Sequence, residues 1–119
     1  NSAIKVWFKV PPDANVAADM ALVLSYRPQA APGATNNVVR LTLTAKTQNT
    51  TRTVTAGDSI IMADDTNWAS YTGTANVVEG GDYAVNDIVG VTITRDTGVA
   101  NNAGTGIDIG TISLSYSSL

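Results

Sequence analysis

Two segments near the end of the chain alternate apolar and polar residues, and this pattern constrains the fold more than any other feature. The first spans residues 88–96 and carries an apolar residue at every second position from Val89 to Ile93. The second spans residues 107–116 and follows a stretch rich in Gly and Asn. A period of two is typical of half-buried antiparallel strands, because successive side chains point to opposite faces. We therefore predict an all-β fold that ends in a β-hairpin with a long loop.

The apolar parity changes within the second segment. Ile107 and Ile109 share one parity, whereas Ile112 and Leu114 share the other. One inserted residue would return all four side chains to the same face, and Gly110 is the position that best accommodates such a β-bulge. The alternative is that Ile107 and Ile109 belong to the loop and do not pair.

Three earlier segments alternate in the same way, and turn-forming residues separate them. They cover residues 4–10, 20–26 and 39–46. Pro11 and Pro12 end the first of them, because proline cannot donate a hydrogen bond to a neighbouring strand. Short strands at this spacing are typical of a sandwich or a barrel, and we predict that residues 1–119 form one domain.

The middle of the chain is less regular, and its alternation does not settle every boundary. We expect, in chain order, a strand, a turn and a short apolar segment over residues 51–55, 56–58 and 59–62. Residues 63–69 are predicted as a loop or a single helical turn, and strand character resumes over residues 71–78.

Composition removes several classes of function. The chain of 119 residues contains no cysteine and no histidine. Disulfides and thiolate sites are therefore excluded, together with Ser-His-Asp triads and zinc-protease sites. Only seven residues are basic and the net charge is −3, which argues against a nucleic-acid partner because phosphate binding needs clustered Lys and Arg. No apolar run approaches the length of a membrane span, so we expect no membrane partner.

Five segments together resemble a known class of domain. They are residues 6–13, 22–26, 38–43, 91–96 and 111–116, of which the strand end Arg95-Asp96 is the most recognisable part. In order and spacing they resemble the jelly-roll β-sandwich domains of tailed-phage virion proteins, which occur in capsid decoration or cement proteins, head fibres and tail appendages. The resemblance implies an antiparallel jelly-roll-like β-sandwich of about seven or eight strands. It also implies a structural, usually oligomeric component of the virion.

Acidic residues are candidates for chemistry, but turn formation explains them more simply. Asp64, Asp65 and Asn67 could supply oxygen ligands to Ca²⁺, yet their spacing lacks the ligand order of an EF-hand loop, and a solvated turn or helix cap is the simpler interpretation. A glycosidase needs two well-placed carboxylates, and the one glutamate, Glu79, lies in a Gly-rich turn. We therefore expect no enzyme activity, no cofactor and no metal site.

Aromatic residues are the other candidates for contact. Trp7 lies between Lys5 and Lys9 in an alternating segment, so it is either covered by a neighbouring element or displayed. Trp68 and Tyr71 lie close together near a predicted loop, and exposed aromatic side chains are suited to holding sugar rings. We name these residues as candidate interface or ligand contacts: Lys5, Trp7, Lys9, Trp68 and Tyr71. The alternative is that the rings fill the sandwich or a subunit interface.

These patterns leave three hypotheses for function. The leading one is a non-enzymatic protein of the virion surface, hence extracellular, that binds the major capsid protein or another virion protein and self-associates as a trimer or dimer. The second is a carbohydrate-binding module or receptor-binding tip that holds a glycan with Trp68, Tyr71 and Tyr83. The third is a subunit of a surface filament or adhesin, in which donor-strand exchange would need an incomplete sandwich.

Overall fold

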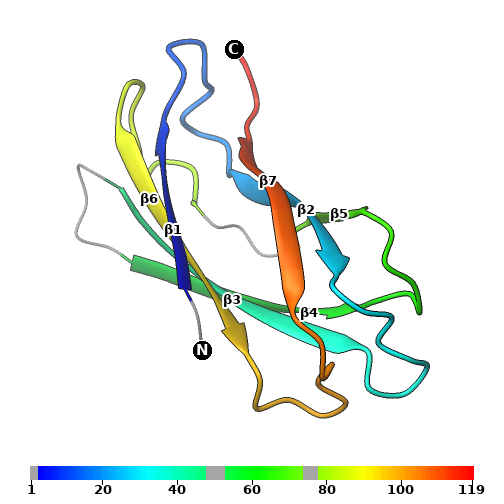
Figure 1. Cartoon of the computed structure of the whole chain (residues 1–119). Helices are drawn as coiled ribbons and strands as arrows, with labels where there is room; N and C mark the ends of the chain where they lie inside the picture. Colours follow the sequence, from blue (N-terminus) through cyan, green and yellow to red (C-terminus); the bar gives the residue numbers. More distant parts are fainter. Residues whose placement is uncertain (1–2, 48–52, 74–77) are drawn as a thin grey trace.

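The computed structural model describes residues 3–47, 53–73 and 78–119, and these residues form seven β-strands and no helix. In chain order the strands are β1 Ala3–Lys9, β2 Ala21–Pro28, β3 Val38–Thr47, β4 Thr53–Ile61, β5 Ala69–Thr72, β6 Ile88–Asp96 and β7 Ile107–Ser115. They form two antiparallel sheets, with the strand orders β1-β6-β3-β4 and β5-β2-β7 (Figure 1). The predicted all-β sandwich is therefore confirmed.

The core lies between the two sheets, and the central strands supply its most buried side chains. Leu22 and Leu24 of β2 are at most 1% exposed, and Leu43 of β3 is also 1% exposed. Val89 and Val91 of β6 are completely buried. Because every second side chain of a strand points to the same face, each central strand sends most of its large apolar residues into this core.

The predicted terminal hairpin is wrong, because β6 and β7 belong to different sheets. β6 pairs with β1 and β3, whereas β7 pairs with β2. The loop 97–106 leads the chain from one sheet to the other (Figure 1). Arg95 holds this loop, since its guanidinium donates hydrogen bonds to the backbone oxygens of Ala103 at 2.6 Å and Thr105 at 2.7 Å. Alternation identifies the buried face of a strand, but it does not say which strand lies at its edge.

The predicted bulge at Gly110 is confirmed. Two residues of β7, Gly110 and Thr111, lie opposite the single residue Ser25 of β2. The backbone N–H of Thr111 donates a hydrogen bond of 2.8 Å to the Ser25 hydroxyl. The alternative in which Ile107 and Ile109 stay in the loop is wrong, because both residues pair with β2. The extra residue brings the apolar side chains on both sides of the bulge onto the core face.

The predicted turn at residues 56–58 is also wrong. These residues continue β4, which pairs with β3 without interruption from Ile61 to Thr53. A long partner strand offers a continuous ladder of hydrogen bonds, and this ladder outweighs the turn tendency of Gly57. Residues 51 and 52 of the strand predicted before this turn lie outside the described residues.

The strand predicted over residues 71–78 is shorter than expected and starts earlier. β5 ends at Thr72, residues 74–77 lie outside the described residues, and Val78 forms an isolated bridge with Met20. Residues 63–68 form a loop without a helical turn. In this loop Asp65 Oδ1 accepts a hydrogen bond from the backbone N–H of Asn67. This is an Asx-turn, which stabilises the loop conformation without a helical turn.

One margin of the sandwich is less buried than its centre. β1 is an edge strand of the four-stranded sheet, and β7 is an edge strand of the three-stranded sheet. Most of their inward side chains pack against the core but are only partly buried, and Ile4 is 39% exposed. We call this margin the β1–β7 seam, and its inward side chains are Ile4, Val6, Phe8, Ile107, Ile109, Ile112 and Leu114.

Candidate functional site

The outer face of the four-stranded sheet brings together three of the predicted contact residues. Lys5, Trp7 and Lys9 are all exposed and lie on the side of β1 that points away from the core. Trp7 pairs with Gly90 of β6, and Gly90 in turn pairs with Lys46 of β3. The four side chains Lys5, Trp7, Lys9 and Lys46 therefore form one basic-aromatic cluster, which we call the Trp7 face.

Trp7 lies on the sheet but is not buried by it. A Cβ atom at Gly90 would come within 2.5 Å of the Trp7 ring, so the ring rests directly on the glycine backbone. Aromatic rings commonly cover glycines of a neighbouring strand in this way. Trp7 nevertheless remains 67% exposed, because its outer surface has no neighbour in the described part of the chain. Such a surface is suited to contact with another molecule.

Basic residues gather on this side of the protein although the chain is acidic overall. Four of the seven basic residues lie on the outer face of the four-stranded sheet, namely Lys5, Lys9, Arg40 and Lys46. Arg40 is 3.9 Å from the carboxylate of Asp96 on the neighbouring strand. Because the net charge is −3, the remaining surface is acidic. The sheet face and the rest of the molecule therefore carry opposite charge.

Trp68 covers the outer face of the other sheet. Its ring lies against Gly110 at the bulge, where a Cβ atom would come within 2.8 Å of it. The Arg27 guanidinium carbon lies 5.0 Å from the ring centroid, in the geometry of a cation–π contact. Arg27 also forms a 3.0 Å ion pair with Asp108. Trp68 is 51% exposed, but this network already occupies part of its surface.

The aromatic residues proposed as a sugar platform do not lie together. Tyr71 pairs with Leu24 and contacts the core, whereas Trp68 lies on the outer face of the same sheet. Tyr83 is 6% exposed, and its hydroxyl lies 2.6 Å from the backbone oxygen of Ala18. Burial, followed by the nearby Asp19 carboxylate, raises the pKa of Tyr83 above its ordinary value.

The acidic residues of the structure shape turns and ion pairs. Asp64 accepts a hydrogen bond of 2.9 Å from the backbone N–H of Gly33. Asp108 accepts hydrogen bonds from Gln29 and Arg27, which lower the pKa of its carboxyl group. Within residues 3–47, 53–73 and 78–119, no three acidic side chains come close enough together to hold a metal ion.

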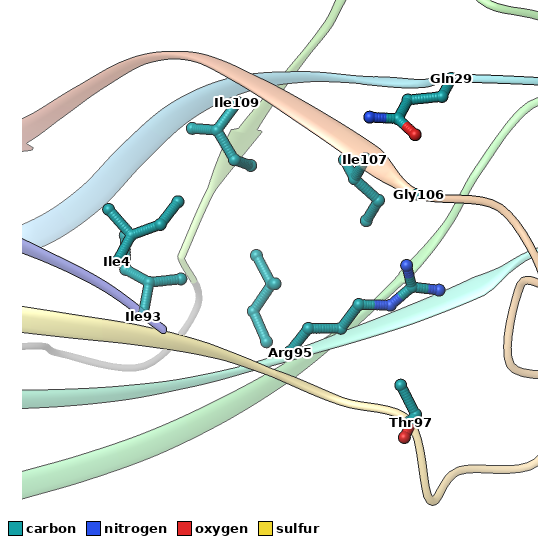
Figure 2. Close-up of a pocket in the computed structure, with 9 residues that line it drawn as sticks. Ile4, Gln29, Ile93, Arg95, Thr97, Gly106, Ile107 and Ile109 are labelled. Atoms are coloured by element: carbon teal, nitrogen blue, oxygen red, sulfur yellow. The ribbon is translucent and has the colours of Figure 1, made fainter. Parts of the chain in front are cut away.

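A cavity of about 300 Å³ opens between the sheets at one end of the β1–β7 seam. Its apolar walls come from both sheets, and Figure 2 shows Ile4 and Ile93 on one side of the space and Ile107 and Ile109 on the other. Arg95 lies along the cavity among these apolar side chains. A second cavity, of about 180 Å³, lies at the other end of the seam.

Arg95 is the functional candidate that sequence reasoning missed. Its Nε is shielded from solvent and has no hydrogen-bond partner. Among the residues whose side chains the structure describes, which leave out residues 47 and 53–58, no carboxylate lies within ion-pair distance of its guanidinium. The sequence signal was available, because Arg95 has the parity of the inward residues Val91 and Ile93 and therefore belongs to the core face.

Comparison with known proteins assigns the chain to no family. Searches against protein-family models, curated proteins and solved structures found no match to the chain. Among the described residues, there is no helix long and apolar enough to cross a membrane.

Proposed function

We propose that this protein is a non-enzymatic structural domain of a tailed-phage virion surface, where it binds the particle and self-associates. The virion setting rests on the resemblance of the strand segments to jelly-roll domains of virion proteins. The two-sheet all-β architecture is compatible with that origin, although its three-stranded sheet has one strand fewer than each sheet of an eight-stranded jelly roll. The capsid protein or another virion protein is the second partner.

The exposed ring of Trp7 carries the proposal of self-association. Tryptophan is enriched among the residues that dominate binding energy at protein interfaces. Covering the exposed part of a tryptophan removes roughly 150 Å² of mostly apolar surface from water, which stabilises a contact by about 3 kcal/mol. Lys5 and Lys9 flank the ring, where they would remain at the polar rim of the contact.

The charge distribution favours a head-to-tail contact. Two Trp7 faces brought together would place like charges opposite each other, whereas a Trp7 face against the acidic side of a second copy joins opposite charges. A contact between two different surfaces closes into a ring when the rotation between copies permits it. Of the trimer and the dimer that the resemblance implies, only the trimer closes through a contact between two different surfaces, and we propose that form.

Sedimentation velocity over a range of protein concentrations tests this proposal. The wild-type chain is expected to form trimers, and Trp7→Lys is expected to weaken their association about 100-fold or more, because it removes the apolar ring and adds charge. Trp68→Lys is the matched control, since it makes the same change on the other sheet and should leave association unchanged. Higher salt should weaken the wild-type trimer.

Two results would contradict the proposal. A wild-type chain that stays monomeric at all concentrations would contradict self-association. Equal loss of association in the Trp7→Lys and Trp68→Lys variants would contradict the Trp7 face as the contact surface. The virion setting is tested separately by mass spectrometry of purified particles from the virus that carries the gene, where absence of the protein contradicts it.

A further inference from the structure

We propose that the β1–β7 seam accepts an extended peptide strand from a partner protein, with alternating apolar side chains and one carboxylate that lies beside Arg95. This inference does not depend on self-association through the Trp7 face. It uses a different part of the molecule, namely the unpaired margin between the two sheets.

The seam is built like a sandwich that lacks one strand. The four-stranded sheet ends at β1 and the three-stranded sheet ends at β7, and both strands have a free edge in the described structure. A strand paired with β7 would give two sheets of four strands. Its inward side chains would lie beneath Ile4, Val6 and Phe8 of β1, none of which is fully buried.

The two cavities set the spacing of side chains in the added strand. Ile4 lines the larger cavity and Phe8 lines the smaller one, and these residues are four positions apart on β1. Residues i, i+2 and i+4 of a strand point to the same face and span about 13 Å. An added strand can therefore place side chains i and i+4 in the two cavities and side chain i+2 between them, opposite Val6.

The direction of the strand follows from the sheet. All pairings between the seven strands are antiparallel, and β7 runs from the larger cavity, lined by Ile107 and Ile109, to the smaller one, lined by Leu114. An antiparallel neighbour would reach the smaller cavity first. Its residues i and i+2 would then be apolar, and residue i+4 would enter the larger cavity next to Arg95.

Arg95 defines the chemistry at that last position. Its guanidinium lies among isoleucines and is held by backbone oxygens. No carboxylate lies within ion-pair distance of it among the residues whose side chains the structure describes. A cation in such surroundings attracts an anion more strongly than a cation on the surface does. A carboxylate at position i+4 would supply a negative charge in the cavity that Arg95 lines (Figure 2).

A peptide explains more of the seam than a small amphiphile does. A fatty acid could place a carboxylate beside Arg95 and an apolar tail in the larger cavity. It would leave the backbone edge of β7 unpaired and the smaller cavity empty. A peptide strand fills both cavities and satisfies the free edge with main-chain hydrogen bonds, which is the usual basis of strand addition.

Binding of a synthetic peptide tests the proposal. The probe is the capped, fluorescein-labelled heptapeptide Thr-Leu-Thr-Val-Thr-Glu-Thr, measured by fluorescence anisotropy with the full chain. We expect saturable binding, a weakening of about tenfold when Glu is replaced by Gln, and a similar weakening for the reversed sequence. Hydrogen exchange should slow for the amides of β7 but not for those of β5, the other edge of the same sheet.

Variants of the protein test the location. Ile4→Glu places a negative charge at the larger cavity and should weaken binding about tenfold or more. Ile61→Glu is the matched control, because Ile61 is 76% exposed on β4 at the opposite edge of the same sheet, and it should have no effect. Arg95 itself is left unchanged, because its substitution would also release the loop 97–106.

Several outcomes would overturn the inference. A peptide N-methylated at alternate residues that binds as well as the unmodified one would show that main-chain pairing is not involved. If dodecanoate then also displaces the peptide, the seam is a site for an amphiphile instead. Absence of binding to the wild-type chain also overturns it. The Trp7→Lys variant should bind the peptide normally, so a failure here and a failure of self-association are separate results.

Discussion

The centre of the sandwich and the β1–β7 seam are built from the same alternating pattern, but they differ in burial. Leu22 and Val89 in the central strands are completely buried, whereas Ile4 on β1 is 39% exposed. The inward side chains of β7 are also only partly buried. Each central strand has a neighbour on both sides and a sheet beneath it, while each seam strand has one free edge.

This difference shows that apolar periodicity and burial are separate properties. A strand with apolar residues at every second position has one face ready to be buried. Whether that face is covered depends on how many strands the opposite sheet contributes. Here the three-stranded sheet ends before it covers β1 completely, and the seam is therefore available for contact.

Matched leucine truncations should give the largest difference between the two regions. Leu43→Ala is expected to lower the free energy of unfolding by about 3–4 kcal/mol, because Leu43 is 1% exposed in the centre and leaves a cavity. Leu114→Ala in the seam should cost about 1 kcal/mol, since solvent already reaches its surroundings. Urea denaturation of both variants measures the difference. Equal losses would mean that the seam is as tightly packed as the centre.

Arg95→Lys should have the next largest effect and should act on the loop. A lysine keeps the charge but cannot reproduce the forked hydrogen bonds to Ala103 and Thr105, so we expect a loss of about 2 kcal/mol. Hydrogen exchange should become faster within residues 97–106. Arg40→Lys is the matched control on the surface and should change stability by less than about 0.5 kcal/mol. Unchanged exchange in the loop would contradict the role given to Arg95.

Glycine substitutions should destabilise the protein more in the seam than in the centre, the reverse of the leucine truncations. Gly110→Ala in the seam strand should cost about 1.5 kcal/mol, because the new Cβ meets both the Ser25 hydroxyl and the Trp68 ring at the bulge. Gly90→Ala in a central strand should change stability by less than about 0.5 kcal/mol, because the exposed Trp7 ring can move aside. Thermal unfolding of both variants compares them. A larger loss for Gly90→Ala would show that Trp7 is held more firmly than its exposure indicates.

The smallest expected effect is a pH dependence at Asp108 on the seam strand. Hydrogen bonds from Gln29 and Arg27 lower the pKa of Asp108 in the folded state. The resulting stabilisation is therefore present above the ordinary Asp pKa of about 3.9 and is lost as the pH falls through the lower folded value. Asp108→Asn should reduce stability at pH 6 and have less effect near pH 2. A difference between wild type and variant that does not shrink on acidification would contradict this coupling.

The strands of this protein could be predicted well where the alternation was regular, and their pairing could not. The parity change between Ile109 and Ile112 correctly indicated a bulge at Gly110. The same two strands were wrongly joined as a hairpin, because Arg95 and the loop 97–106 send them to different sheets. In β4, a turn predicted from local residues gave way to continuous pairing with β3.

The candidate sites show the same division. Alternation alone placed Lys5, Trp7 and Lys9 on one face of a strand, and the structure brings them together there. It could not show that Trp7 rests on Gly90, because that contact joins strands far apart in the chain. The proximity of Trp68 and Tyr71 in the sequence suggested one aromatic surface. In the structure Tyr71 of β5 contacts the core, whereas Trp68, just before β5, lies on the outer face of the sheet.

The amino-acid sequence by itself determined the all-β class, the exclusion of histidine and cysteine chemistry, the shared face of Lys5, Trp7 and Lys9, and the bulge at Gly110. These properties follow from residue type and from a period of two, which act along a single strand. Only the tertiary structure decided which strands share a sheet, how far β1 is covered, and that Arg95 lies along a cavity with its Nε shielded from solvent. Those properties depend on contacts between distant segments, and no local pattern records the neighbours that a strand will meet.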